Sequence, residues 1–276
     1  MREACFGSHR SALRAGPVLV SETTHRPSLR TPVHAHPFLC LHFVLRGLYE
    51  ESGKGETHRL EPGWFLFKPE GERHWNDFRE VGAVTLRLEL DRGSSPILEE
   101  ALPARMTALR APHLSLLAAR AHAELAGRDE LSPVIAESLA LELFAGIARL
   151  PRSRGSDHTS SLARRCADLL DARFREPCRL GLAAEELGVE RTTLAHVFRR
   201  EYGCSVGEYL RRCRLAHVAR RLQGDDGPGL AELAADAGFA DQSHMTRTFK
   251  AEFGVPPGRW RARYAGAGAR SGTREA

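Results

Sequence analysis

An internal repeat in the C-terminal part constrains the fold of this chain more than any other feature. Residues 184–188 (AEELG) recur fifty residues later as residues 234–238 (AADAG). A phenylalanine followed by a basic residue comes ten residues after the first glycine, at Phe198, and eleven after the second, at Phe249. A small helix, a glycine turn and a second helix fit this pattern in each copy. The repeat therefore predicts two similar helix-turn-helix units.

The second helix of each unit has an apolar face and a polar face. Leu194, Val197 and Phe198 follow helical spacing in the first copy, as Met245 and Phe249 do in the second, which predicts a buried stripe. The other face carries donors and acceptors that suit base edges and phosphates, because Gln pairs with adenine and Arg with guanine. We therefore predict DNA contacts at Thr192, Thr193, His196, Arg199, Gln242, Ser243, His244 and Arg247.

A single helix is expected between the two units, within residues 205–224. Leu210, Leu215 and Val218 lie along one of its faces. This helix would fix the separation of the two units. If they are held roughly 34 Å apart, they meet successive major grooves of one duplex.

The second unit resembles the signature of a known family. Residues 238–250 (GFADQSHMTRTFK), together with 254–257 (GVPP) and Trp260-Arg261, are similar to the signature of the AraC/XylS family of bacterial transcription regulators. The resemblance covers residues 162–264. It implies DNA-recognition helices at residues 190–201 and 241–252, and contact of the second unit with RNA polymerase.

The chain departs from the family pattern at two positions. His196 stands where the family commonly has Arg, which weakens the base contact that the resemblance implies there. Met245 replaces a usual aromatic residue or Leu, and the flexible thioether side chain should fit the core.

Charge is distributed unevenly between the two halves. Residues 1–150 have a net charge of −1 and residues 151–276 a net charge of +6. This asymmetry indicates a polyanionic partner for the second half, and double-stranded promoter DNA fits that charge. A basic solvated surface without a partner is the alternative that composition leaves open.

The N-terminal part is rich in short β-like runs. Residues 34–90 contain LCLHFVL, WFLF and AVTLRLEL, separated by Gly and Pro, which predicts an antiparallel barrel or sandwich. Residues 95–150 change to helical spacing, with an apolar face at Leu114, Ala118 and Ala121 and a second that includes Leu139 and Leu143.

Two motifs in this part resemble those of the cupins, a family of small β-barrels. The first is matched in spacing by His34, His36, Cys40 and Gly47, and the second by Gly63, Pro69, Gly71 and His74. The resemblance implies one metal ion inside the barrel, held by His34, His36 and His74, with Cys40 in the place of the usual Glu.

His34 and His36 are two apart on a strand, so they point to the same side. Three nitrogens and one sulfur suit Zn²⁺ or Fe²⁺. A pocket lined by histidines without metal is the alternative, and the nearby His42 shows that this strand is simply rich in histidine.

The expected fold class is α+β, with a cupin-like β-barrel followed by an all-α domain that holds two helix-turn-helix units. The expected domains are a sensor at 1–94, a helical dimerisation segment at 95–150, a linker at 151–161, a DNA-binding domain at 162–265 and a disordered tail at 266–276. Two chains are expected to pair as a homodimer.

We expect a cytoplasmic protein, because the six cysteines form no C-x-x-C pair and no segment has the roughly 18 apolar residues of a membrane span. The leading hypothesis is a transcription regulator, not an enzyme, that responds to a small molecule or metal. The alternatives are a metal-dependent cupin oxygenase or isomerase with an appended DNA-binding domain, and a DNA-architectural protein.

Overall fold

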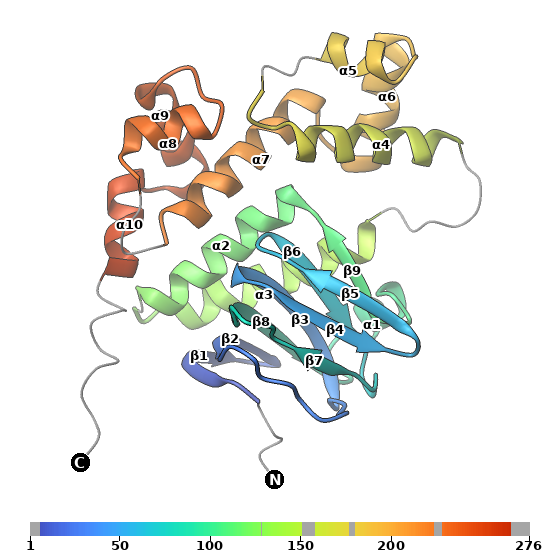
Figure 1. The fold of residues 1–276 in the computed structure, drawn as a ribbon, viewed down its shortest axis with the longest axis vertical. Coiled ribbons are helices and arrows are strands. Elements are labelled where there is room, and N and C mark those ends of the chain that lie inside the picture. Colours follow the sequence, from blue (N-terminus) through green and yellow to red (C-terminus); the bar gives the residue numbers. More distant parts are fainter. Residues whose placement is uncertain (1–5, 128, 151–157, 177–179, 224–227, 266–276) are drawn as a thin grey trace. The chain divides into compact units, whose positions relative to one another are not determined.

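The computed structural model describes all residues except 1–5, 128, 151–157, 177–179, 224–227 and 266–276 (Figure 1). The chain divides into unit 1, residues 1–149, and unit 2, residues 150–276. The expected tail and most of the expected linker lie outside the described residues, although the end of that linker, from His158, is already helical. Within the described ranges, no helix is both long and apolar enough to cross a membrane.

Unit 1 contains two antiparallel sheets. The larger has the strand order β1-β2-β8-β3-β6-β9 and the smaller the order β5-β4-β7. The strands of the larger sheet are β1 (Ser8–Ala15), β2 (Val18–His25), β3 (Phe38–Gly47), β6 (Trp64–Lys68), β8 (Ala83–Asp91) and β9 (Thr107–Arg110). Those of the smaller sheet are β4 (Tyr49–Gly53), β5 (Glu56–Leu60) and β7 (Trp75–Asp77).

The expected closed barrel is not found, because no strand ladder among the described residues joins the two sheets. The connection from β2 to β3 contributes only isolated bridges, from Arg30 to Asp77 and from His34 to His74. That connection contains Pro27, Pro32 and Pro37. Proline has no N–H to donate to a ladder, so the chain cannot form there the continuous pairing that barrel closure needs.

Three strands of the larger sheet fall outside the range that the sequence predicted. β1 and β2 precede it and pair with each other, and β2 also pairs with β8 along its whole length. β9 lies within residues 95–150, which were expected to be helical, and pairs with β6 from Trp64 to Phe67. Its four residues are too few to show the alternation of apolar and polar side chains that is typical of a strand. They form a strand because they pair with β6.

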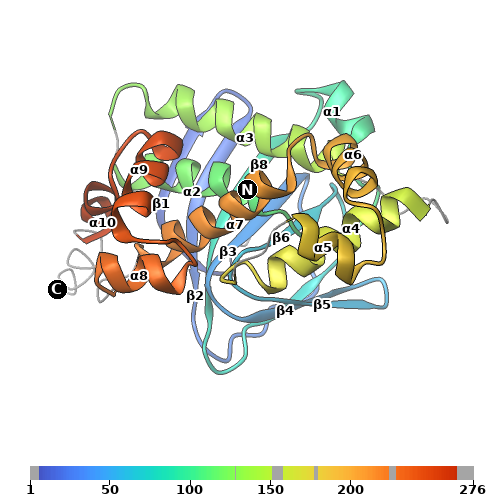
Figure 2. The same ribbon diagram turned by 90° about the horizontal axis from the view of Figure 1, so that it is seen from above.

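The helices of unit 1 are α1 (Pro96–Ala101), α2 (Pro112–Ala126) and α3 (Ser132–Arg149). The predicted apolar faces are confirmed, since Leu114, Ala118, Leu139 and Leu143 are all buried. α2 and α3 pack on each other and on β1 and β2 (Figure 2). Residues 96–149 are therefore part of unit 1.

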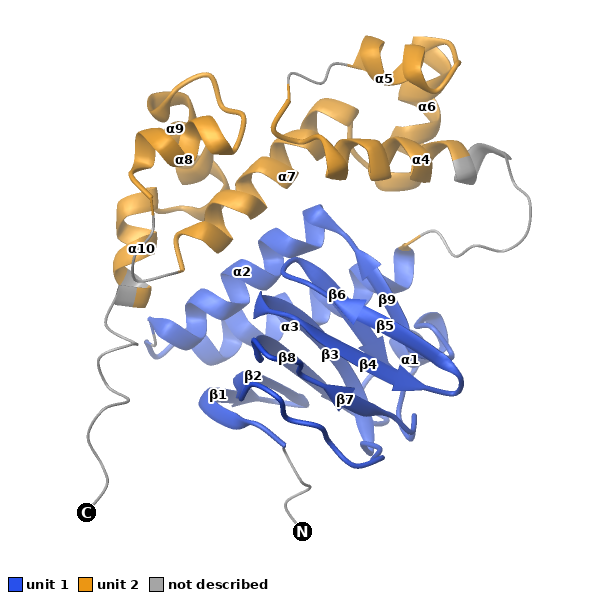
Figure 3. Cartoon of the chain, viewed as in Figure 1, with its two compact units in different colours: residues 1–149 blue, residues 150–276 orange. Residues whose placement is uncertain are grey.

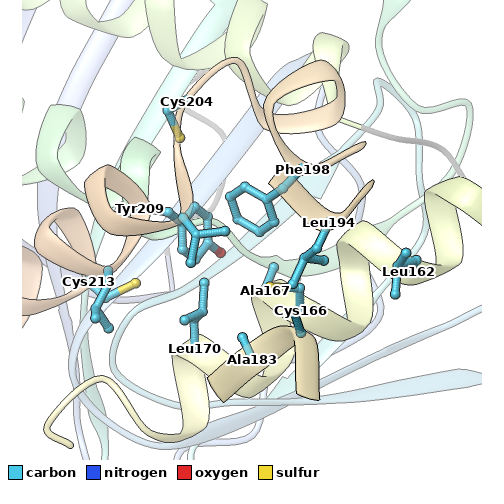
Figure 4. Packing of buried hydrophobic residues seen from close by; sticks show 13 residues of the cluster. Leu162, Cys166, Ala167, Leu170, Ala183, Leu194, Phe198, Cys204, Tyr209 and Cys213 are labelled. Carbon is cyan, nitrogen blue, oxygen red and sulfur yellow. The ribbon is translucent and has the colours of Figure 1, made fainter. Parts of the chain in front are cut away.

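Unit 2 is wholly helical in its described residues (Figure 3). Its helices are α4 (His158–Ala172), α5 (Leu180–Glu186), α6 (Arg191–Tyr202), α7 (Val206–Arg221), α8 (Leu230–Asp236), α9 (Gln242–Phe253) and α10 (Pro257–Ala265). Phe198 of α6 and Tyr209 of α7 meet edge to face at 5.3 Å, in one core cluster with Cys166 and Leu170 of α4 (Figure 4). The predicted stripe at Leu194, Val197 and Phe198 is thus confirmed as buried.

The repeat found in the sequence forms equivalent turns. Gly188 and Gly238 have positive φ angles of 69° and 77°. The N–H of Val189 donates to the Ala184 carbonyl at 3.0 Å, and fifty residues later Phe239 donates to Ala234 at 2.9 Å. A glycine in the left-handed region followed by a bond of this kind is the Schellman motif that ends helices. Each short helix, α5 or α8, is therefore stopped in the same way before the next one starts.

Candidate nucleic-acid interface and histidine pocket

The two longer helices of the repeat, α6 and α9, carry the predicted DNA contacts. Each begins one residue later than the sequence predicted and has the same length of 12 residues. All eight side chains are exposed, four on α6 and four on α9. The structure therefore places every predicted contact on the surface of a recognition-type helix, while Met245 and Phe249 of α9 are fully buried behind them.

Side-chain caps and glycines fix the ends of α9. The carboxylate of Asp241 accepts from the N–H of His244 at 2.7 Å, which satisfies one of the free donors of the first turn. Gly254 ends the helix in the left-handed conformation, and its N–H donates to Lys250 at 2.9 Å. Gln242 and Ser243 lie directly after the cap, at the positive end of the helix dipole, where phosphate oxygens bind well.

The arginines of the two polar faces are exposed. Among the described residues, neither Arg199 nor Arg247 forms a salt bridge, so both guanidinium groups are available to an external anion. Lys250 is also exposed, three residues beyond Arg247 on the same face of α9. The prediction missed Lys250, although its helical spacing from Arg247 could have identified it.

Helix α7 joins the two helix pairs without interruption. Ser205 and Glu208 form a capping box at its start, and its 16 residues span about 24 Å. Near its end, His217 lies 2.6 Å from Asp236 of α8. Arg214 donates to the carbonyls of Phe174 and Glu176 at 2.8 Å each, beyond the end of α4. α7 is thus tied to both halves of unit 2, as a rigid spacer requires.

In unit 1, the backbone brings three of the four predicted metal ligands together. His34 and His74 exchange a reciprocal pair of N–H to carbonyl bonds at 2.9 Å each. Gly71, which has a positive φ of 72°, donates its N–H to the His36 carbonyl at 2.8 Å. The three imidazole rings lie 4.3–5.1 Å apart between centroids, and their candidate donor atoms lie within 4.8 Å of one another.

Backbone carbonyls fix the tautomers of two of these rings. Nδ1 of His34 lies 2.9 Å from the Pro32 carbonyl, and Nδ1 of His74 lies 2.8 Å from the Glu72 carbonyl. A carbonyl only accepts, so both Nδ1 atoms carry the proton and both Nε2 atoms present a lone pair. Orientation of a metal-binding imidazole by a carbonyl behind it is usual in metal sites.

The lowered pKa values keep the three imidazoles neutral near neutral pH, and the charge of Lys68 that contributes to the lowering also opposes a metal cation. Burial, together with the charge of Lys68, lowers the pKa of His36 to about 2 and that of His74 to about 4. The pKa of His34 is lowered mainly by burial. Neutral imidazoles are metal ligands. The tetrahedral geometry of Zn²⁺ needs nitrogens about 3.3 Å apart, so donor atoms that lie within 4.8 Å of one another would have to move closer to bind the ion.

Cys40 is not part of this cluster. It lies in the middle of β3, where its register partners are Lys68 of β6 and Glu89 of β8. It is fully buried, and burial raises the pKa of its thiol. A neutral thiol is a poor ligand, so the structure supports three nitrogen donors without the sulfur.

A buried ion pair that sequence reasoning missed lies beside the cluster. The ammonium of Lys68 is 2.7 Å from Glu51 and 3.2 Å from Nε2 of His74. Asn76 donates to the other oxygen of Glu51 at 2.8 Å. Lys68 is 2% exposed and Glu51 is fully buried. The alternation of β4 could have indicated Glu51, because it shares a face with the buried Tyr49.

The cluster and the ion pair border a small pocket. Its volume is about 30 Å³, which holds one or two waters or a single ion. His42, Lys68 and Arg87 contribute to its lining. Nε2 of His42 is buried and has no partner among the described residues. In this conformation the pocket accepts an ion more readily than a sugar-sized molecule.

Comparison with known proteins places unit 2 among transcription regulators. A family described as "Helix-turn-helix domain" matches residues 183–263, which include most of α5 and all of α6, α8 and α9. The multiple antibiotic resistance protein MarA of Escherichia coli is 33% identical over 94 residues, 34% of this chain and 73% of that protein. An AraC-like transcription regulator of Streptomyces lividans is 32% identical over 146 residues, 50% of this chain.

The chain spans 48% of the length of the Streptomyces regulator. ToxT of Vibrio cholerae is a solved structure with 12% identity and a TM-score of 0.37, aligned over 90% of this chain and 99% of its own. The relatives whose names state a role are transcription regulators, as the sequence predicted, and not enzymes. On the match to MarA over most of that protein's length, the chain belongs to the AraC/XylS family of transcription regulators.

Proposed function

We propose that unit 2 binds promoter DNA by inserting α6 and α9 into successive major grooves. The observation that carries this proposal is the pair of exposed polar faces at equivalent positions of the repeat, each backed by a buried apolar stripe. α7 supports it as a continuous spacer between the two helices. Thr192, Thr193, His196 and Arg199 would read one half of the site, and Gln242, Ser243, His244 and Arg247 the other.

Replacing Gln242 or Arg247 with Ala is expected to relax sequence preference at one position of the DNA site. A lost base contact costs about 1–3 kcal/mol against the preferred sequence. The measurement is a gel-shift titration with sites that the wild-type protein has selected from random-sequence DNA, and with single-base variants of those sites.

Arg259→Ala is the control, because it removes one positive charge from an exposed side chain of α10, outside both recognition helices. It should leave the preference among bases unchanged. Wild-type preference in both the Gln242 and the Arg247 variant would reject the assignment of these contacts.

We also propose that unit 1 senses a cation through the histidine pocket and passes its state to the regulator. Three converging imidazoles, two of them with tautomers set by backbone carbonyls, support a first-row transition metal such as Zn²⁺ or Fe²⁺. When bound, the metal would supply a charge that organises the residues around it. His34, His36 and His74 would hold it, and a small-molecule effector would need a wider pocket than the one described.

Two chains are proposed to pair through the helices of unit 1, and unit 2 is proposed to contact RNA polymerase. The support for pairing is an apolar patch at the start of α3, where Leu131 is 65% and Val134 is 63% exposed. Leu131 directly precedes α3 and Val134 lies in its first turn, and exposed apolar side chains near each other in the chain favour burial against a second surface. Sedimentation velocity should show a dimer at micromolar protein and a shift toward monomer in Leu131→Glu/Val134→Glu. A wild-type monomer at that concentration would reject pairing.

A further inference from the structure

The Lys68 ammonium already occupies a nitrogen that a metal ion would need. Nε2 of His74 must accept a hydrogen bond, since its Nδ1 donates to the Glu72 carbonyl, and the donor at 3.2 Å is Lys68. One lone pair cannot bind two cations. We propose that the Lys68 ammonium competes with a metal ion for Nε2 of His74. A metal ion would then enter the histidine cluster only when Lys68 moves away from that nitrogen. This inference rests on the proposed sensing function of unit 1.

The pocket contains a second acceptor to which Lys68 can move. His42 lines the same pocket and is 8% exposed. Its Nδ1 lies 3.4 Å from the Tyr49 hydroxyl. In the tautomer that carries its proton on Nδ1, His42 donates to the Tyr49 oxygen, and its Nε2 then has a free lone pair. Nε2 is the buried nitrogen that has no partner among the described residues.

Glu51 would keep the Lys68 ammonium inside the pocket during the exchange. Its two oxygens accept from Lys68 at 2.7 Å and from Asn76 at 2.8 Å. Asn76 in turn is held by Thr31, whose hydroxyl donates to the Asn76 side chain at 3.1 Å and accepts from its N–H at 2.8 Å. Because Lys68 and His42 line the same pocket, the proposed exchange has Lys68 turn from His74 to His42 with its bond to Glu51 retained. No charge leaves the pocket, and no buried carboxylate is left without its cation.

The test compares Co²⁺ affinity, read from the visible absorption of the bound ion, in full-length proteins. The variant is Lys68→Met/Glu51→Gln, which removes both charges together and still offers Asn76 an amide oxygen. We expect it to bind Co²⁺ about 10- to 100-fold more tightly than the wild type, because the ion no longer displaces a charge-assisted hydrogen bond. Lys68→Gln also removes the competing ammonium but leaves Glu51 unpaired 3.5 Å from Nε2 of His74, so its affinity for Co²⁺ should rise at least as much, at a cost in stability.

Two controls make the result specific. Lys54→Met removes a lysine that pairs with Glu72 and is 69% exposed, and it should leave the affinity for Co²⁺ unchanged. His42→Leu should weaken binding in the wild-type background and have no effect in the double variant, where no ammonium needs a second acceptor. Thermal melting of each protein shows whether it is folded.

Equal Co²⁺ affinity in the wild type and in both Lys68 variants would overturn the exchange. Absence of Co²⁺ binding in all of them would overturn it together with the metal-sensing part of the proposed function. DNA binding by unit 2 is measured separately in the gel-shift titration, so its success or failure does not depend on either outcome. Binding that persists in His34→Ala would place the ion outside the cluster and would also reject the proposal.

Discussion

Glu51→Ala is expected to destabilise unit 1 by about 3–5 kcal/mol, because it leaves the ammonium of Lys68 buried without its carboxylate. Lys68 is 2% exposed, so its ammonium is largely desolvated. Asn76 loses its acceptor in the same substitution. For a unit of this size the midpoint of thermal unfolding should fall by roughly 10 °C. Circular dichroism of the full-length protein measures this.

The neighbouring Glu50 provides the matched control. It pairs with Arg79 on the surface, where the arginine side chain is 49% exposed, and exposed pairs contribute about 0–1 kcal/mol. Glu50→Ala should therefore shift the midpoint by at most a few degrees. The double variant Lys68→Met/Glu51→Gln should also remain close to wild type, since both charges go together. If the Glu51→Ala protein were as stable as the Glu50→Ala protein, the Lys68–Glu51 ion pair would not be desolvated.

Phe249→Ala is expected to cost about 3–5 kcal/mol in unit 2 and to abolish specific DNA binding. Phe249 is fully buried behind the polar face of α9. Its ring contacts Phe253 at 4.3 Å and Trp260 at 5.7 Å between centroids. The cavity left by the ring would loosen the packing of α9 on α10. The polar side chains of α9 would then no longer be held in a fixed position for binding DNA. Urea unfolding followed by tryptophan fluorescence in a Trp64→Phe/Trp75→Phe background, which leaves Trp260 as the single tryptophan, with a gel shift on the same samples, measures both effects.

Met245→Leu is the control for this prediction. Met245 is also fully buried on α9, but the exchange conserves volume and should cost less than about 1.5 kcal/mol. DNA binding should be retained. If Phe249→Ala still bound its site with wild-type affinity, the packing of α9 against α10 would have no part in recognition.

The arrangement of unit 2 could be predicted largely from local sequence. A glycine that ends a helix, a buried stripe at helical spacing and an exposed polar face are all set within about twenty residues, and the repeat doubles each signal. The positive φ of Gly188 and Gly238, and the burial of Leu194 and Phe249, agree with the prediction. The actual DNA contacts stay a prediction, because they depend on a partner.

Unit 1 was harder to predict because its sheets depend on contacts between distant segments. β9 is four residues long, and only its pairing with β6 makes it a strand. The spacing of His34, His36 and His74 did indicate a cluster, whereas Cys40 matched by spacing alone and lies elsewhere in the sheet. Glu51 and Lys68 belong to no motif. Glu51 lies on β4 and Lys68 on β6, two strands of different sheets. Their pairing therefore depends on how the two sheets face each other.

The first strand limits how unit 1 can associate with other molecules. β1 is the outermost strand of the larger sheet, and its free side would otherwise be a template for another β-strand. It carries Arg10 and Arg14, which are 42% and 51% exposed, and its pairing with β2 is irregular between His9 and Ser11. Charge and irregularity at a rim discourage continuous hydrogen bonding between sheets of separate copies. Unit 1 is therefore protected from continuous strand pairing with another copy along this rim.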